Sequence, residues 1–401
     1  MPPKKYMRIG INGYYLTTQT AGIGQYTINL LRALGEVDKT NKYYVFVPQK
    51  VDWDLPDNFK LKVIAPTFLF PKTFINRFIW EEYQLGFAIK KYKIDVFHAM
   101  YQSLPLGSEK IGNVVTIHDA IPWRFPFERK QRLYRWYSDY RKELVTKRAK
   151  KIITISETSK IDFASIYEIK PETIEVTYES IDPIFHAKFT PKEIQDFKQR
   201  YDINRKYILY TGGLKRHKNL RMLIKSFAIL VQDHGFEGDL YVLGAKRSTM
   251  AVSPFIYYKV EDLEKYTKMK KIGSRVKFVG FVSRKDMALF MHNARAFVSL
   301  SLYEGFGLPA VEAMASGCPS VLSNLGAYPE IAQDAALFVY PYGPHRIAEA
   351  IDSILTKPEL REDLSKKGIR RSKFFNRLTI AERVLEVYKE VYDDYKVSFQ
   401  P

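Results

Sequence analysis

The chain has 401 residues, enough for two domains of ordinary size, and its 46% hydrophobic and 27% charged content is typical of a folded globular protein. Its 63 lysines and arginines against 44 aspartates and glutamates give a net charge of +19, which calls for an anionic partner such as a phosphorylated substrate, an anionic membrane face or a nucleic acid. The single cysteine, Cys318, excludes an internal disulfide and fits a reducing compartment, and no apolar run approaches the roughly 18–20 residues that span a bilayer.

The first half of the chain alternates short β-rich runs with helical runs. Such alternation predicts a parallel sheet whose faces are covered by helices. The expected strands are 7–12, 43–47, 61–64, 95–98, 113–117, 151–155 and 173–177, and the expected helices are 24–35, 76–92, 128–148 and 157–165.

Two stretches of this half carry residues typical of ligand sites. Gly22 and Gly24 lie between the first strand and its helix, where glycine permits a tight turn or a close approach to a ligand. His118 and Asp119 follow the strand 113–117, at the edge of a parallel sheet where ligands bind. A structural turn and a buried histidine would need the same residues.

The segment from Arg124 to Lys151 is strongly basic and rich in aromatic residues. It holds eleven lysines and arginines against three acids, and part of it has the spacing of an amphipathic helix. A solvated basic face and a membrane-surface site remain equally open. Earlier in the chain, Asp52-Trp53-Asp54 imitates a metal-binding D-x-D triplet, but Pro56 follows closely and favours a surface turn. We expect no metal there.

A second α/β series begins after a proline-containing connection near residues 181–185. Its expected strands are 207–211, 240–244, 276–279, 296–300, 320–322 and 337–339, and a long amphipathic helix is expected over 378–395. After the strand at 207, Gly212 and Gly213 precede a cluster of cations that includes Arg216 and Lys218. Fixed cations before a helix can neutralise a diphosphate leaving group without a metal.

The most informative motif runs from Glu304 to Pro319. Two carboxylates eight positions apart, Glu304 and Glu312, bracket a glycine turn and the start of a helix. The free N–H groups of such a helix start attract an anion, and the glycines allow it to approach. Carboxylates can accept hydrogen bonds from hydroxyl groups, so the pattern favours a nucleotide-sugar as ligand.

This motif closely resembles the E-x7-E signature of the retaining glycosyltransferases of family 4. The resemblance implies an α/β GT-B fold, in which two Rossmann-like parallel-sheet domains face each other across a cleft and a C-terminal helix crosses back to the N-terminal domain. We therefore expect an acceptor-binding domain over 1–185, a nucleotide-sugar donor domain over 186–375 and the crossing helix over 376–401.

The resemblance also implies roles for the residues at matching positions. Lys218 matches the family's phosphate-binding lysine, whereas Gly213 stands where the common family form has arginine, so that Arg216 is left as the second cation. The implied catalytic residues are His118, Lys218 and Glu304. The implied donor-binding residues are Gly22, Gly24, Gly212, Gly213, Arg216, Phe281, Gly305, Phe306, Gly307, Leu308 and Glu312, and the implied acceptor-binding residues are Asp119, Trp123 and Arg124.

The expected function is transfer of a hexose, with retention of anomeric configuration, from a nucleoside-diphosphate sugar to a glycan or lipid-linked acceptor. Mannose from GDP-mannose is preferred, with a dTDP-rhamnose or UDP-hexose transferase as the alternative. A nucleotide-sugar 2-epimerase and a non-enzymatic nucleic-acid-binding protein are weaker rivals. We expect no cofactor, no metal and no nucleic-acid partner, and a cytoplasmic location with peripheral association at the inner membrane face as an open possibility.

Overall fold

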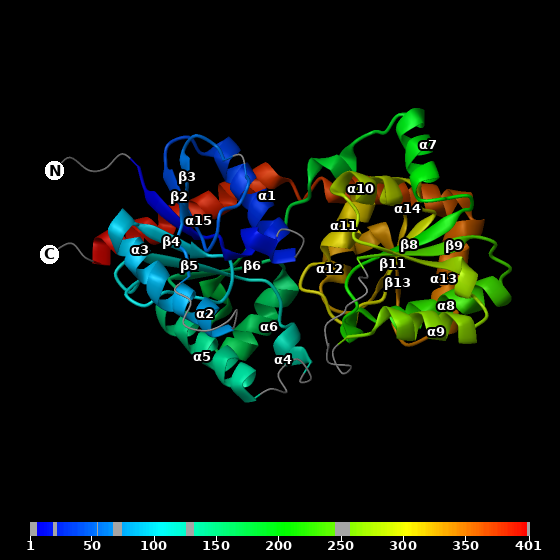
Figure 1. Ribbon diagram of the computed structural model, residues 1–401, viewed down its shortest axis with the longest axis horizontal. Helices are drawn as coiled ribbons and strands as arrows, with labels where there is room; N and C mark the ends of the chain where they lie inside the picture. Colours follow the sequence, from blue (N-terminus) through cyan, green and yellow to red (C-terminus); the bar gives the residue numbers. More distant parts are fainter. Residues whose placement is uncertain are drawn as a thin grey trace. The chain divides into compact units, whose positions relative to one another are not determined.

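The computed structural model describes residues 6–18, 22–53, 55–66, 74–125, 132–244 and 257–398 (Figure 1). The chain divides into two compact units. The first comprises Met1–Ala120, Arg129–Ser180 and Asn376–Pro401, and the second comprises Ile121–Glu128 and Ile181–Phe375. The last helix of the chain therefore belongs to the first unit.

The first unit is built on a parallel sheet in the order β3-β2-β1-β4-β5-β6-β7. The strand order reverses between β1 and β4, and in open α/β sheets ligands bind at the carboxyl ends of the strands at such a reversal. The strands are β1 (Arg8–Asn12), β2 (Lys42–Val47), β3 (Phe59–Val63), β4 (Val96–Ala99), β5 (Gly112–Ile117), β6 (Lys151–Thr154) and β7 (Ile174–Val176).

Helices cover both faces of this sheet. Helices α1 and α15 pack together on one face, and α2, α3, α5 and α6 cover the other (Figure 1). The helical elements are η1 (Tyr14–Thr18), α1 (Gly22–Val37), α2 (Phe74–Ile79), η2 (Trp80–Gln84), α3 (Leu85–Tyr92), α5 (Arg132–Arg148), α6 (Glu157–Tyr167), η4 (Pro171–Thr173) and α15 (Arg377–Ser398).

The second unit repeats the architecture with a parallel sheet in the order β10-β9-β8-β11-β12-β13, which reverses between β8 and β11. The strands are β8 (Tyr207–Thr211), β9 (Asp239–Leu243), β10 (Val276–Gly280), β11 (Ala296–Ser299), β12 (Ser320–Ser323) and β13 (Ala336–Val339). The helical elements are α4 (Ile121–Arg124), η5 (Pro183–His186), α7 (Pro191–Arg200), η6 (Arg216–Lys218), α8 (Leu220–Gln232), α9 (Val260–Met269), η7 (Gly273–Arg275), α10 (Arg284–Asn293), α11 (Leu308–Ala315), α12 (Tyr328–Ala332), η8 (Gln333–Ala335), α13 (Pro344–Thr356) and α14 (Pro358–Ser372).

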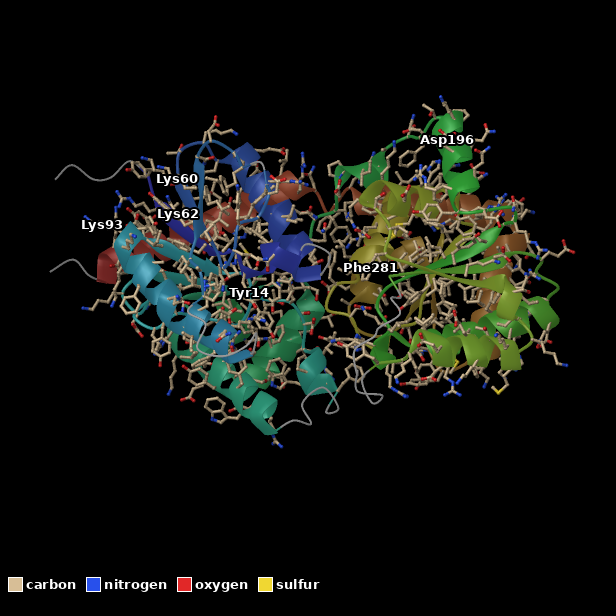
Figure 2. The ribbon with its side chains drawn as sticks, in the orientation of Figure 1. Tyr14, Lys60, Lys62, Lys93, Asp196 and Phe281 are labelled. Carbon is tan, nitrogen blue, oxygen red and sulfur yellow. The ribbon has the colours of Figure 1, made fainter. Side chains whose placement is uncertain are left out.

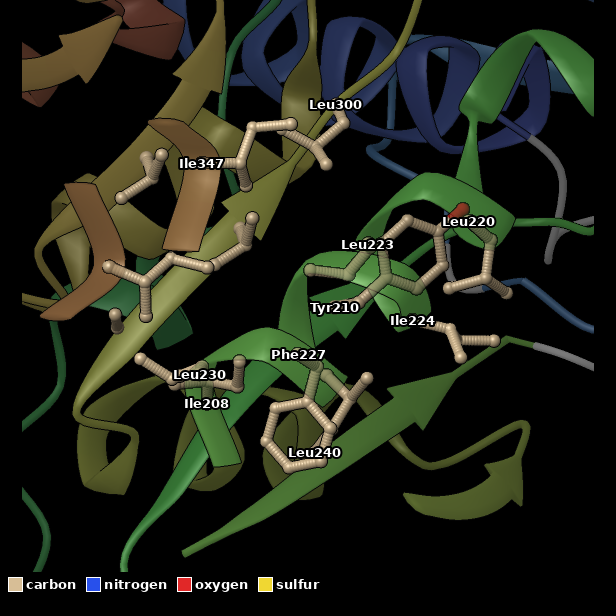
Figure 3. Packing of buried hydrophobic residues seen from close by; sticks show 14 of the residues in the cluster. Ile208, Tyr210, Leu220, Leu223, Ile224, Phe227, Leu230, Leu240, Leu300 and Ile347 are labelled. Carbon is tan, nitrogen blue, oxygen red and sulfur yellow. The ribbon is translucent and has the colours of Figure 1, made fainter. Parts of the chain in front are cut away.

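The core of the second unit lies between its sheet and the paired helices α8 and α13. Figure 3 shows Phe227 of α8 beside Leu240 of β9 and Leu230 of α8 beside Ile208 of β8, and all four side chains are buried. The strands β8, β9 and β11 are buried along their whole length, as expected of a parallel sheet covered on both sides, whereas the edge strand β10 is only partly buried. This packing fixes the carboxyl ends of β8 and β11, where the candidate site is found.

The fold class predicted from the sequence is confirmed. All thirteen expected strands are present within the described residues, with bounds that differ by at most a few positions. The helix expected over 76–92 is interrupted by one π-helical turn, η2. Within the described residues, no helix combines the length and apolarity needed to span a bilayer.

Candidate functional site

The second unit brings two predicted motifs together at the switch point of its sheet. The loop after β8 leads to Lys218, and the loop after the neighbouring strand β11 leads to Glu304. The amide of Leu302 donates a hydrogen bond to the carbonyl of His217, with an N···O distance of 2.7 Å. This backbone bond fixes the two loops side by side.

Lys218 and Glu304 form a two-pronged ion pair at this point. The ammonium nitrogen of Lys218 lies 2.6 Å from Oε1 and 2.8 Å from Oε2 of Glu304. Burial alone would raise the pKa of Glu304, but the charge and hydrogen bonds of Lys218 outweigh it and hold the pKa below its ordinary value of 4.5. The carboxylate is therefore charged at neutral pH, and its remaining lone pairs are available to hydroxyl donors.

The glycine turn that follows Glu304 has a steric requirement for its shape. Gly307 caps α11 with φ of 93°, and a Cβ at this position would lie 2.5 Å from the ring of Tyr328. The Tyr328 hydroxyl is in turn 2.6 Å from Oγ of Ser299, on β11. The turn thus places the start of α11 after β11, at the switch point. Pro309 has no N–H and the amide of Ala310 donates a 2.8 Å hydrogen bond to the carbonyl of Gly307, so it is the positive end of the helix dipole that favours an anion here. Of the other predicted residues, Gly305 and Phe306 are buried within the turn, and Leu308 begins the helix.

The second carboxylate of the motif is also paired. Oε1 of Glu312 accepts a hydrogen bond of 2.7 Å from Nη2 of Arg284, the first residue of α10. The Arg284 guanidinium stacks on the ring of Phe185 at 4.5 Å from its centroid. Glu312 is buried, whereas a third of the Arg284 side chain is exposed. Arg284 is a site residue that the sequence did not reveal, because no motif marks the partner of Glu312.

Glycines with left-handed backbone end three adjacent strands of this sheet. They are Gly212 after β8, Gly244 after β9 and Gly280 at the end of β10, with φ values of 154°, 81° and 85°. A Cβ on Gly244 would lie 2.9 Å from the carbonyl oxygen of Gly212, so the three loops pack backbone against backbone. A Cβ on Gly213, in contrast, would meet no atom within 4 Å.

The remaining predicted donor residues lie around this edge in different surroundings. The Arg216 guanidinium lies 4.9 Å from the ring centroid of Tyr258, so it is directed at an aromatic ring. Phe281 follows β10 and is 60% exposed, which leaves its ring available for stacking (Figure 2). His217 stacks on Phe125 at 5.4 Å, and burial, followed by the charge of Lys218, lowers its pKa to about 3.

The predicted acceptor residues Trp123 and Arg124 lie on the short helix α4, which clusters with the second unit. The Arg124 guanidinium is 5.9 Å from the ring centroid of Tyr303, the residue before Glu304. Both side chains are thus in the unit that holds the donor motif, although the sequence places them in the first half of the chain.

His118 in the first unit is held by two partners. Its Nε2 donates a 3.0 Å hydrogen bond to the carbonyl of Met100, and its Nδ1 lies 3.5 Å from Oε1 of Glu179. The ring of Tyr26 packs edge-on against it at 4.7 Å. A histidine between a carbonyl and a carboxylate is held in one orientation. Glu179 was not anticipated from the sequence.

The other predicted residues of the first unit lie near the start of α1 or next to His118. Asp119 is partly buried after β5, Gly24 is buried within α1, and Gly22 is exposed at its first position. A Cβ on Gly22 would meet no atom within 4 Å, so packing gives no reason for a glycine there. Residues 19–21 of this loop and Asp54 of the D-x-D triplet lie outside the described residues, among which no group of three or more potential metal ligands occurs.

Two family models match the chain in tandem: Glycosyltransferase Family 4 over residues 20–184 and Glycosyl transferases group 1 over residues 191–371. The chain is 24% identical over 384 residues to the O-antigen chain mannosyltransferase B of Escherichia coli, covering 92% of this chain and 96% of that protein. It is 25% identical over 346 residues to the O-antigen chain mannosyltransferase RfbU of Salmonella typhimurium, covering 84% and 88%. Its fold is similar to that of Anabaena HepE, solved in complex with UDP-glucose, with a TM-score of 0.75, 17% identity and coverage of 96% and 100%.

Proposed function

Because glycosyltransferase family models match both of its halves, this chain belongs to the family 4 glycosyltransferases, and we propose that it is a retaining enzyme that transfers mannose from GDP-mannose to a glycan or lipid-linked acceptor. The observation that carries this proposal is the Lys218–Glu304 ion pair at the switch point of the second sheet. It combines a cation for the diphosphate with a carboxylate for sugar hydroxyls, beside the positive end of a helix dipole.

In this proposal the donor lies along the carboxyl edge of β8, β10 and β11. Lys218 and the positive end of the α11 dipole stabilise the diphosphate as negative charge develops on it. Glu304 accepts hydrogen bonds from hydroxyls of the transferred sugar, and Glu312, oriented by Arg284, accepts them from the ribose. The exposed ring of Phe281 stacks near the nucleobase. The cations and the helix dipole supply the charge stabilisation, so the reaction needs no metal.

The choice of mannose is supported by the O-antigen mannosyltransferases, which match most of the chain at low identity. The UDP-glucose complex of HepE makes a UDP-hexose the first competitor to test. His118, held by Met100 and Glu179, is proposed to contact the transferred sugar. Asp119, Trp123 and Arg124 are proposed to contact the acceptor.

A transfer assay with a panel of sugar nucleotides tests this proposal. GDP-mannose, UDP-glucose and dTDP-rhamnose are each incubated with a bacterial lipid-linked glycan fraction, and the anomeric configuration of the product is read by NMR. We expect transfer from GDP-mannose with retention. Preferred use of another sugar nucleotide would change the sugar that we assign to the donor. A product with inverted anomeric configuration would overturn the proposed reaction. Epimerisation of the donor in the absence of acceptor would overturn it as well.

We also propose that the first unit contacts an anionic membrane surface through its exposed aromatic side chains on α3 and α5, together called the aromatic face. Phe87 is 74% and Trp136 57% exposed, and Trp136 stacks on Tyr140 at 5.8 Å. Lys147 on the same helix α5 is exposed as well. Exposed aromatic rings among cations are typical of surfaces that bind anionic lipid headgroups.

Co-sedimentation with vesicles containing phosphatidylglycerol tests the membrane contact. We expect salt-sensitive binding that Trp136→Ala and Phe87→Ala weaken together. Ile161→Ala is the matched control, because Ile161 is 69% exposed on α6 and lies outside the aromatic face. Equal binding of all variants, or no binding by the wild type, would contradict this proposal.

A further inference from the structure

A buried cluster of charges in the first unit is not explained by the donor site. It comprises Arg77 on α2, Glu81 in η2 and Arg141 on α5. Nε of Arg77 lies 3.0 Å from Oε1 of Glu81, and Nη2 of Arg141 contacts Oε2 of the same carboxylate. Glu81 is fully buried and Arg141 is 2% exposed, so two cations share one anion in the interior.

The cluster lies at the switch point of the first sheet. The Arg77 guanidinium packs over Tyr14, Tyr15 and Tyr101, at 4.6, 4.9 and 5.3 Å from their ring centroids. Tyr14 (labelled in Figure 2) and Tyr15 come after β1, separated from it by Gly13, and Tyr101 comes after β4, separated from it by Met100. These are the two strands between which the strand order reverses, where ligands bind in folds of this kind.

The same edge holds His118. The carbonyl that accepts its Nε2–H belongs to Met100, which precedes Tyr101 in the chain. The Tyr101 ring is also 5.7 Å from the guanidinium of Arg141. The cluster therefore adjoins the histidine proposed to contact the transferred sugar, and it does so entirely within the first unit.

Several donors of the two arginines are unused. Nε and Nη1 of Arg141 and Nη2 of Arg77 are buried and have no hydrogen-bond partner among the described residues. A buried donor without a partner destabilises the fold, and an uncompensated buried charge does so more strongly. Water could satisfy the N–H groups, but only an anion would also balance the excess positive charge.

Glu82 does not supply that balance. Both of its carboxylate oxygens are buried and lack hydrogen-bond partners in the described part of the chain. Burial raises the pKa of Glu82 to about 7, so a substantial fraction of it is uncharged at neutral pH. Arg77, with 23% of its side chain exposed, leaves the cluster open to solvent on one side.

The backbone at the cluster is also irregular. Glu81 and Glu82 lie in the π-helical turn η2, between α2 and α3. Single π-helical turns are rare and occur frequently at functional sites, because they are less favourable than the continuous α-helix. A purely structural ion pair between α2 and α5 would not require one.

We propose that Arg77 and Arg141 bind a phosphate group, and that the acceptor of the transfer reaction is consequently a phosphorylated compound. The anion site follows from the cluster alone, whereas calling its ligand the acceptor rests on the proposed function. Guanidinium groups bind phosphate through charge-assisted N–H donors, and Nε and Nη1 of Arg141 with Nη2 of Arg77 are the donors that have no partner among the described residues. The rings of Tyr14, Tyr15 and Tyr101, which pack against the Arg77 guanidinium, hold it in place.

Calorimetric titration of the full chain with methyl phosphate tests the site. Arg141→Lys keeps a cation beside Glu81 but removes Nε and Nη1, and we expect at least tenfold weaker binding. Arg135→Lys is the matched control, since Arg135 is exposed on the same helix. Lys218→Ala removes the phosphate ligand of the donor edge, so methyl phosphate binding that persists in this variant and is lost in Arg141→Lys belongs to the first unit.

Unchanged affinity in Arg141→Lys, or loss of binding only in Lys218→Ala, would overturn the proposal. If circular dichroism shows that Arg141→Lys is unfolded, Arg77→Lys decides by the same criterion. Tighter binding of farnesyl diphosphate than of methyl phosphate would identify a lipid-linked ligand. Equal affinity for the two compounds would identify a soluble phosphorylated glycan. Both results support the phosphate site. Failure of every sugar nucleotide to bind would end the proposed transfer reaction but leave this result standing.

Discussion

Single residues at the donor edge are arranged as charge pairs drawn from different loops. Lys218 after β8 holds Glu304 after β11, and Arg284 at the start of α10 holds Glu312. Each cation fixes the orientation of a buried carboxylate, and Lys218 also keeps the pKa of Glu304 below its ordinary value.

The two glycines after β8 should respond differently to substitution. Gly212→Ala places a Cβ 2.8 Å from the Tyr210 hydroxyl at a φ of 154°, and we expect a loss of about 1–3 kcal/mol in the free energy of unfolding. Gly213→Ala meets open space, and we expect no loss and a gain of up to about 1 kcal/mol from the unfolded chain. Urea denaturation compares them; equal stabilities would contradict the backbone described for this loop.

The motif residues could be predicted from the sequence, whereas their partners could not. Glu304, Glu312 and Lys218 stand in local patterns with recognisable spacing. Arg284 and Glu179 are distant in sequence from the residues they contact, and isolated charged residues are too common to be singled out. The roles assigned to the motif residues stay predictions until ligand binding is measured.

At the level of elements, the helix α15 is tied to the first sheet by a buried hydrogen bond. The Tyr388 hydroxyl lies 2.6 Å from Nδ1 of His98 on β4, and Nε2 of the same ring lies 2.7 Å from Oγ1 of Thr116 on β5. The final helix of the chain is therefore part of the first unit's core, as the family resemblance implies.

Removing that hydroxyl should loosen the helix. Tyr388→Phe leaves Nδ1 of a fully buried His98 without its partner, and we expect the first unit to lose about 1–3 kcal/mol. Tyr392→Phe, one turn further along α15, is the control, because the Tyr392 side chain is only partly buried. Hydrogen exchange of β4 and β5 measures the effect; equal protection in both variants would show that the bond does not anchor α15.

Elements were predictable from the sequence to different degrees. The buried strands could be predicted because each is a short apolar run in the sequence. Their parallel arrangement could be predicted from the alternation of strands with helices. The π-helical turn at Trp80–Gln84 left no signal, because its residues fit the same helical pattern as α2 and α3. The short helix α4 was also missed, since four residues show no periodicity.

Across the whole molecule, mild acid should weaken the second unit more than the first. Burial lowers the pKa of His186, His217 and His292 in the second unit, so below pH 6.5 the unfolded chain binds protons that the folded unit does not, and stability falls. In the first unit, burial lowers the pKa of His98 to about 3, which destabilises the folded unit in acid in the same way. Burial also raises the pKa of Glu82 to about 7, so the folded unit takes up a proton there and is stabilised as pH falls from 7 toward 4.5. The effect of Glu82 offsets that of His98.

Hydrogen exchange at pH 6.5 and pH 5, corrected for intrinsic rates, resolves the two units. We expect the protection of β8 and β11 to fall by about 1 kcal/mol or more, and that of β4 and β5 to change little. A loss in the first unit as large as that in the second would contradict the assignment of Glu82 and the histidines.

Calorimetric binding of GDP-mannose to the wild type and to Lys218→Ala, Glu312→Gln and Arg346→Ala tests the donor site most directly. Arg346 serves as the control because it is largely exposed on α13. We predict saturable binding that is at least about tenfold weaker in the first two variants and unchanged in the third. Equal affinity in all four proteins would contradict a donor site at the Lys218–Glu304 switch point.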